Sequence, residues 1–107
     1  MGLQKIAKIK DVLLEVLPDV YHYTAKTPGR RYAVWMELGE KSQSDGDNCK
    51  IEQAIYGTID FYTEDEDDTK QDEIQEALKR EGISFFLASV QYEKETGLIH
   101  YEWEWVI

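Results

Sequence analysis

Apolar residues recur every three or four positions near the start of the chain, at Ile6, Ile9, Leu13, Val16 and Leu17. Lysine, aspartate and glutamate occupy most of the positions between them, which is the pattern of an amphipathic helix with one buried side. Pro18 lacks the amide hydrogen that would continue such a helix. The sequence therefore predicts a helix that ends before Pro18.

Two segments rich in valine, tyrosine and threonine follow, at residues 19–25 and 31–38. The Pro28-Gly29 pair between them suits the central positions of a type II turn, so we expect the two segments to form a hairpin. Side chains alternate between the two faces of a strand. The second segment should therefore carry on one face Ala33, Trp35 and Glu37, and on the other Tyr32, Val34, Met36 and Leu38.

Residues 39–50 (GEKSQSDGDNCK) are polar and small, and this stretch is about twice the usual length of a connection. We expect a loop that is either mobile or organised by a partner. Alternating apolar residues over 53–62 predict a third strand. Gly57 in its middle indicates a bulge or a close approach by another group.

The acidic run at residues 63–73 leads into a second predicted helix, which Asp68 or Thr69 can cap and which Gly82 can end. Residues 84–92 (SFFLASVQY) form a predicted fourth strand. Because this strand is nearly apolar on both faces, we expect it to be central or covered on both sides. A short turn over 93–97 precedes a fifth strand at residues 99–107.

These elements predict a single domain over residues 1–107 of the α+β class. We expect an antiparallel sheet of about five strands with two helices, in the order α-β-β-β-α-β-β, and both helices on one face of the sheet. The only cysteine, Cys49, excludes an internal disulfide. No signal peptide and no apolar stretch of about 18 residues is present, so we expect an intracellular protein without a membrane partner.

The formal net charge is -10, from 22 acidic and 12 basic side chains. Such a field repels phosphate backbones, so we expect no direct sequence-specific binding of nucleic acid. Arg30 and Arg31 are interpreted as ordinary strand-end charges. The acidic runs leave one alternative function open, in which the protein mimics nucleic acid and inhibits a DNA-processing protein.

The ending IHYEWEWVI combines tryptophans with glutamates, as a carbohydrate-cleaving site would. Glu102 and Glu104 share one strand face, however, whereas Trp103 and Trp105 share the other. Rings and carboxylates then cannot line one cleft, so a small carbohydrate-active enzyme is the least favoured hypothesis. We predict no catalytic residue, and we expect both tryptophans to pack beneath a helix while both glutamates face water or a neighbouring subunit.

No metal or cofactor site is predicted either. His22 and His100 lack the spacing of zinc ligands. The acidic stretches 44–48 and 64–68 do not match the ligand pattern of a calcium-binding EF-hand loop. Cys49 lacks a neighbouring histidine in sequence, and an unreactive thiol is the simpler interpretation.

The layout as a whole resembles the tail-terminator proteins of long-tailed phages and prophages of Gram-positive bacteria, also described as tail-completion or head-to-tail joining proteins. The resemblance rests on an amphipathic helix ending in LP and on four further segments: RYAVWMELGE, IEQAIYGTIDFYTEDEDD, DEIQEALKREGI and FFLASVQYEKETGLIHYEWEWVI. It covers nearly the full length. YGTIDFYT and ETGLIHYEWEW are its most recognisable parts.

The resemblance implies a structural, non-enzymatic protein with an antiparallel sheet flanked by helices. Such proteins assemble as a ring, commonly a hexamer, on the head-proximal end of the tail tube, end its polymerisation and provide the surface to which the head connector docks. The expected partners are therefore other copies of the chain, the tail-tube protein and the head-connector protein. The expected locations are the host bacterial cytoplasm during assembly and then the virion tail.

Charged residues in the polar segments and on the last strand are the expected subunit or partner interface: Glu40, Lys41, Asp45, Asp47, Glu64, Asp65, Glu102 and Glu104. The long polar loop would become ordered against a neighbouring subunit. Abundant carboxylates would line a channel through which DNA slides without adhering, because like charges repel.

Overall fold

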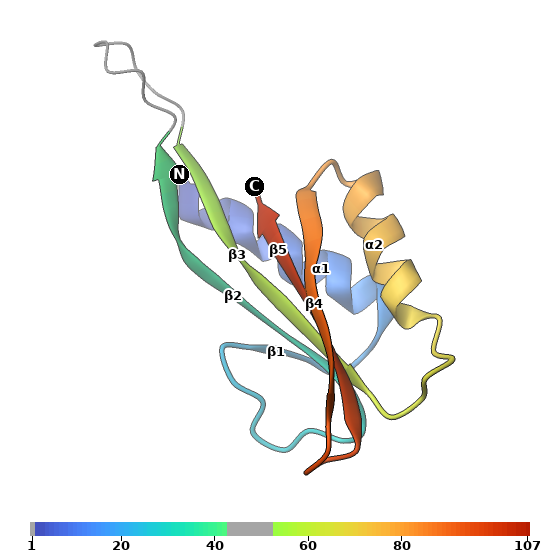
Figure 1. The fold of residues 1–107 in the computed structure, drawn as a ribbon. Coiled ribbons are helices and arrows are strands. Elements are labelled where there is room, and N and C mark those ends of the chain that lie inside the picture. The colour runs from blue at the N-terminus through green and yellow to red at the C-terminus, as the bar shows by residue number, and fades with distance from the viewer. Residues whose placement is uncertain (1, 43–52) are drawn as a thin grey trace, which may run out of the picture.

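The fold is a five-stranded sheet with two α-helices on one side (Figure 1). A computed structural model describes residues 2–42 and 53–107. The elements in chain order are the 3-10 helix η1 (Gly2–Ile6), α1 (Ala7–Val16), β1 (Val20–His22), β2 (Arg31–Ser42), β3 (Gln53–Thr63), α2 (Lys70–Arg80), β4 (Ser84–Glu93) and β5 (Leu98–Val106). The predicted α+β class and element order are confirmed.

The strand order is β1-β2-β3-β5-β4, and the sheet is mixed. Strands β2, β3, β5 and β4 pair antiparallel, but β1 pairs parallel with β2, with Val20 beside Ala33 and His22 beside Trp35. The predicted hairpin between residues 19–25 and 31–38 is therefore wrong. The chain leaves β1 at Tyr23, whose φ of 74° lies in the left-handed region, and residues 24–30 return it to the start of β2.

Both helices lie on the same side of the sheet, as predicted (Figure 1). Their apolar residues form one buried cluster with the strands; its helical members are Ile9, Val12 and Leu13 of α1 and Ile74, Ala77 and Leu78 of α2. The guanidinium of Arg80 pairs with Glu15, and the ammonium of Lys8 donates to the carbonyl of Glu81 at 3.2 Å. These polar contacts link the two helices above a shared core.

The two tryptophans of β5 lie in that core. Trp103 and Trp105 are 1% and 0% exposed, respectively. The indole nitrogen of Trp103 donates to the Gln75 side chain of α2 at 2.9 Å, and that of Trp105 donates to the Thr58 carbonyl at 2.9 Å. The expectation that both rings pack on the helix-covered side is confirmed, and each buried N–H has a partner, as buried indoles require.

Gly57 of β3 is required by a close approach. A Cβ atom at this position would lie 2.0 Å from the Met36 carbonyl oxygen and 2.5 Å from the ring of Trp105. The predicted close approach is thus confirmed. The irregularity itself occurs on the neighbouring strand, because the register between β2 and β3 shifts between Glu37 and Gly39.

Two other expectations about the sheet need correction. The fourth strand was expected to be central or covered on both sides, whereas β4 is an edge strand and most of its residues are exposed. The apolar side chains of β4 therefore do not indicate a buried strand, because the strand lies at the edge of the sheet. Residues 39–42, expected to begin a loop, continue β2. The second helix and the last turn agree with expectation, since Gly82 and Gly97 adopt positive φ values of 73° and 74°.

We call the side of the sheet opposite the helices the open face. Its residues are Tyr32, Val34 and Met36 of β2, Tyr56, Thr58, Asp60 and Tyr62 of β3, and His100, Glu102 and Glu104 of β5. No helix of the described ranges lies on it (Figure 1). Among the described residues, the open face, the edge strand β4 and the end of β2 beyond β1 are therefore accessible parts of the sheet.

Candidate interaction surfaces

The charged residues expected to form an interface do not gather in one place. Glu40 and Lys41 lie near the end of β2, where Ser42 pairs with Gln53. Glu64 and Asp65 follow β3 at the opposite end of the sheet, beyond the pairing of Arg31 with Thr63 (Figure 1). Glu102 and Glu104 lie between these ends on the open face, as the alternation of β5 predicted. Asp45 and Asp47 lie outside the described residues, as do the 44–48 stretch and Cys49.

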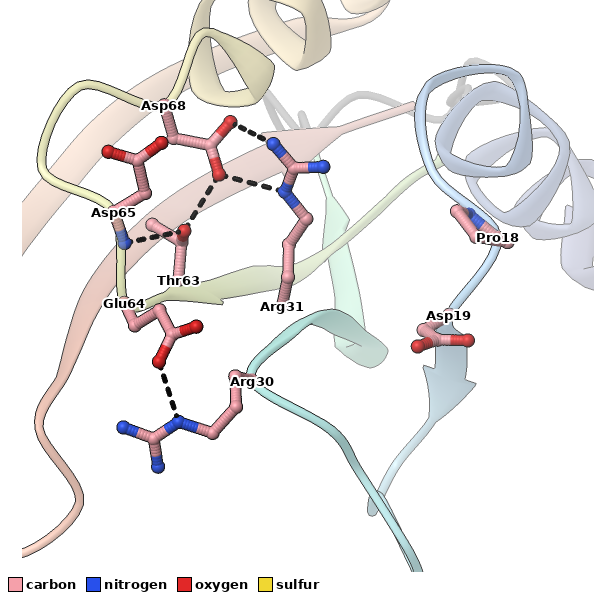
Figure 2. A pocket seen from close by; sticks show the side chains of 8 residues that line it. All are labelled: Pro18, Asp19, Arg30, Arg31, Thr63, Glu64, Asp65 and Asp68. Carbon is pink, nitrogen blue, oxygen red and sulfur yellow. Dashed lines mark hydrogen bonds and ion pairs between the residues drawn. The ribbon is translucent and has the colours of Figure 1, made fainter.

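An ionic cluster around the buried Asp68 side chain lies at the end of β3 (Figure 2). The Arg31 guanidinium donates two hydrogen bonds to the Asp68 carboxylate, at 2.8 and 2.7 Å. The hydroxyl of Thr63 donates to Asp68 at 2.7 Å, and the Lys70 amide donates to it at 2.9 Å. Asp68 thus joins β2, β3 and the first residue of α2, whereas Thr69, at the N-cap position, makes no side-chain capping hydrogen bond.

The hydrogen bonds to Asp68 control its ionisation. Burial alone would raise the pKa of this carboxyl, because burial disfavours the charged form. The donors Arg31, Thr63 and the Lys70 amide outweigh burial and lower the pKa to about 2. Asp68 is therefore a carboxylate at neutral pH.

The same cluster borders a shallow cleft of about 450 Å³ lined by Pro18, Asp19, Arg30, Arg31, Thr63, Glu64, Asp65 and Asp68. Both arginines of the lining are engaged, since the Arg30 guanidinium donates to Glu64 at 3.0 Å. Asp65 accepts the Asp67 amide at 2.9 Å, so part of the acidic run stabilises its own turn. These contacts support a structural role for the cleft, and Arg31 is more than the strand-end charge that the sequence suggested.

Stacked rings cross three strands of the open face. Tyr32 stacks on Tyr62 with centroids 4.6 Å apart, and Tyr62 stacks on His100 at 4.4 Å. Nε2 of His100 lies 2.7 Å from an oxygen of Asp60, and Nδ1 lies 3.3 Å from an oxygen of Glu93. His100 is therefore held between two carboxylates at the end of an aromatic row.

Ionisation on the open face follows from these contacts. The hydrogen bond to Asp60 raises the pKa of His100, although burial alone would lower it. Burial and the neighbouring Asp60 charge also raise the pKa of Tyr62. At neutral pH Tyr32 and Tyr62 are therefore neutral, and they stack in a row with a histidine that is paired with Asp60 and Glu93.

The second histidine belongs to a cluster on the other side of the sheet. The His22 ring stacks on Trp35 with centroids 3.8 Å apart, and Tyr23 stacks on the opposite side of His22 at 3.8 Å. His22 contacts the Glu37 carboxylate at 2.9 Å, and the Tyr23 hydroxyl donates to the same carboxylate. His22 and His100 thus lie on opposite sides of the sheet and do not share a site.

The exposed apolar surface is concentrated at β4. Phe86, Leu87, Val90 and Tyr92 are 57%, 44%, 50% and 64% exposed, respectively. Leu87, Val90 and Tyr92 are paired with Trp103, Tyr101 and Ile99 and therefore lie on the helix side, whereas Phe86 is paired with Glu104 on the open face. The sequence indicated an apolar strand here but not its place at the edge.

The described tryptophans and glutamates of β5 do not form a sugar-binding surface, which the carbohydrate-active enzyme hypothesis would require. The rings of Trp103 and Trp105 are buried beneath the helices, so they are not accessible for stacking on a sugar, and Glu102 and Glu104 point to the opposite side. Within residues 2–42 and 53–107, no group of three or more His, Cys, Asp or Glu side chains is arranged to hold a metal ion.

The fold and its surfaces define a two-layer α+β protein with one uncovered sheet face and one apolar sheet edge. None of the described helices has the length and apolarity needed to span a membrane. In comparisons with known proteins, no protein family model matches the chain and no curated sequence is significantly similar to it.

Proposed function

We propose that this protein is a structural subunit of a phage or prophage tail, similar to the tail terminators, which assembles as a ring of copies at the head-proximal end of the tail tube. In this role it ends polymerisation of the tube and provides the surface on which the head connector docks. It acts by binding other protein surfaces and requires no catalytic residue or cofactor.

The observation that carries the proposal is the arrangement of the elements. The two helices packed against a sheet whose strands β2, β3, β5 and β4 pair antiparallel agree with the antiparallel sheet flanked by helices that the sequence resemblance implies, although the parallel strand β1 makes the whole sheet mixed. The most recognisable segments of the resemblance form the strands that supply key residues of the core. YGTIDFYT forms most of β3, which supplies Gly57, and EWEW forms the part of β5 that supplies Trp103 and Trp105.

The open face supports protein binding in particular. It carries the carboxylates of Glu102 and Glu104 beside tyrosine rings, and it is free of helices along its described length. Tyrosines provide large contact areas at small entropic cost, and acidic groups complement a basic partner. We assign this face to the contact with the tube or the connector.

The nucleic-acid mimic is the weaker hypothesis. Such a protein needs rows of carboxylates that are free to replace phosphates. Many described carboxylates instead pair with basic side chains within the molecule, among them Glu15, Glu37, Asp60, Glu64, Asp68 and Glu73. Their distribution over both helices, both faces and the loop after β3 also does not favour two rows on one convex surface.

The proposal is tested with the tail-tube protein of the same phage or prophage. We expect the chain to bind the ends of assembled tubes as a ring visible by electron microscopy, and to stop tube growth when added during polymerisation. Tubes of unchanged length, without density at their ends, would sink the proposal. Light scattering of the mixture gives an independent measure of the complex.

A charge reversal tests the assignment of the open face. The double substitution Glu102→Lys and Glu104→Lys should weaken tube or connector binding at least about tenfold, because like charges would then face a basic partner. The matched control is Glu66→Lys with Glu76→Lys, two exposed positions outside the open face, which changes the net charge by the same amount and should leave binding unchanged. If both variants weakened binding equally, the open face would not be the site of contact.

A further inference from the structure

Strand β4 presents a long unpaired edge of the sheet within the described residues. Strand β4 has ten residues, and within the described ranges only β5 pairs with it. Its outer backbone N–H and C=O groups therefore point away from the sheet and can pair with another strand. A free edge of this kind accepts an extended segment in β-sheet geometry.

Natural edge strands are usually protected by charged residues, whereas β4 carries one only at its last residue, Glu93. Residues 84–92 contain no charged side chain, although 32% of the residues in the chain are charged. The opposite edge shows the usual protection. There the three-residue β1 covers part of β2, and the uncovered end of β2 carries Glu40 and Lys41.

The side chains of β4 extend this free edge into an apolar surface. Leu87, Val90 and Tyr92 form an exposed apolar strip on the helix side, and Phe86 adds an exposed ring on the open face. An added strand would cover apolar side chains on both faces of the sheet while it pairs with the backbone. Burial of apolar area and main-chain hydrogen bonding would then act together.

We propose that β4 binds β4 of a second copy of this chain, antiparallel, about a two-fold axis, and joins two sheets into one. The uncharged stretch of β4, whose alternation matches that of a second β4 about a two-fold axis, favours a second copy as the partner. Two chains of net charge -10 repel each other, so copies meet most easily where the strand has no charge. A two-fold contact is also self-complementary, since both copies contribute the same strand.

The alternation of β4 is compatible with this symmetry. An antiparallel alignment centred between Ala88 and Ser89 places Leu87 of one copy opposite Val90 of the other, both on the helix side. It also places Phe85 opposite Tyr92 on that side and Phe86 opposite Gln91 on the open face. The register shift between Leu87 and Ser89 is what makes these sides match. No two like charges are directly opposed in this alignment.

Light scattering over a range of protein concentrations gives the first test. We expect the free protein to approach twice the 12.5 kDa mass of one chain as concentration rises. Added salt should strengthen the dimer, because it screens the repulsion between two acidic chains. A constant mass of one chain from micromolar to millimolar concentration would overturn the proposal.

Two matched substitutions locate the contact. Val90→Lys on β4 should raise the dimer dissociation constant at least about tenfold, whereas Leu38→Lys, at a similarly exposed apolar position on the other edge, should leave it unchanged. Circular dichroism checks that both variants fold. A larger effect of Leu38→Lys would show that β4 instead meets β2 of the next copy, which overturns the two-fold arrangement.

Cysteine cross-linking tests the symmetry itself in a Cys49→Ser background. In the proposed alignment, Leu87→Cys chains mixed with Val90→Cys chains should form a disulfide, while each variant alone should not, because like positions are too far apart to bridge. Cross-linking in each variant alone, or none in the mixture of dimers, would contradict the alignment. The inference does not rest on the proposed tail function, since every measurement uses the free protein.

Discussion

The two faces of the sheet are built by the same strands but have opposite chemistry. On the helix-covered side, Trp105 is fully buried and its indole hydrogen bond stays within the core. One residue earlier on β5, Glu104 lies on the open face and is partly exposed. Alternation along a single strand thus separates the residues that stabilise this fold from those available for recognition.

Both faces also contain an ionic cluster, and the two clusters have opposite pH behaviour. The cluster on the helix side is centred on the Asp68 carboxylate and depends on a lost proton. The cluster on the open face is centred on His100 and depends on a gained proton. The two faces can therefore be compared by packing and by pH dependence. The expected effects on the free energy of unfolding decrease from Trp105→Ala to His100→Gln.

Trp105→Ala should give the largest loss of stability. Removing a fully buried indole leaves a cavity, and such changes cost about 3 to 5 kcal/mol, which is a large part of the stability of a small domain. Chemical denaturation followed by circular dichroism measures the loss. Glu104→Ala, its neighbour on the open face, should change stability by less than about 0.5 kcal/mol. Equal losses in the two variants would break the contrast between the faces.

Gly57→Ala should destabilise the helix-covered side without removing any atom. The added Cβ would lie 2.0 Å from the Met36 carbonyl oxygen, which belongs to the backbone of β2 and cannot rotate away. We expect a loss of about 2 to 3 kcal/mol, typical of overpacking in a core. Gly29→Ala is the control, since a Cβ there meets nothing within 4 Å. A neutral Gly57→Ala would mean that the strands separate more easily than their packing indicates.

Asp68→Asn should reduce stability at neutral pH and flatten its dependence on acid. Hydrogen bonds lower the pKa of Asp68 from 3.8 to about 2, so its ionisation contributes about 2 kcal/mol at neutral pH. A group with a lowered pKa contributes above its unfolded value and loses that contribution as pH falls through the folded value. The free energies of unfolding of wild type and variant, plotted against pH, should therefore converge toward about pH 2. Curves that stay parallel would contradict the role of Asp68.

His100→Gln should produce a smaller change with the opposite pH dependence. The hydrogen bond to Asp60 raises the pKa of His100 above 6.5. A group with a raised pKa contributes fully below its unfolded pKa and loses the contribution as pH rises through the folded pKa. Wild type should therefore exceed the variant in stability most clearly under mildly acidic conditions, and the difference should shrink toward alkaline pH. A nuclear magnetic resonance titration of the His100 ring checks the pKa directly.

The elements with strong periodicity were predictable from the sequence. The apolar spacing of α1 and the alternation of β3 and β5 depend on local geometry alone, so their positions and buried faces follow from the chain. The function of Gly57 was also indicated by its place within a strand. Each of these features is determined by residues close together in sequence.

Features that depend on distant residues were not predictable in the same way. The parallel pairing of β1 with β2 joins residues 13 positions apart, and the chain leaves β1 through a left-handed Tyr23, for which its residue type gives no signal. The contact between Arg31 and Asp68 joins residues 37 positions apart. An apolar composition fits a buried strand and a binding edge equally well, so the sequence of β4 could not distinguish them.

The distribution of aromatic residues has an optical consequence. All three tryptophans, Trp35, Trp103 and Trp105, lie on the helix-covered side of the sheet, whereas Tyr32 and Tyr62 lie on the open face. Intrinsic tryptophan emission therefore reports on one face and tyrosine absorbance includes the other. A binding event that leaves tryptophan emission constant would spare the core beneath the helices, and an accompanying change in tyrosine absorbance would then arise at the open face or at the exposed rings of Tyr23 and Tyr92.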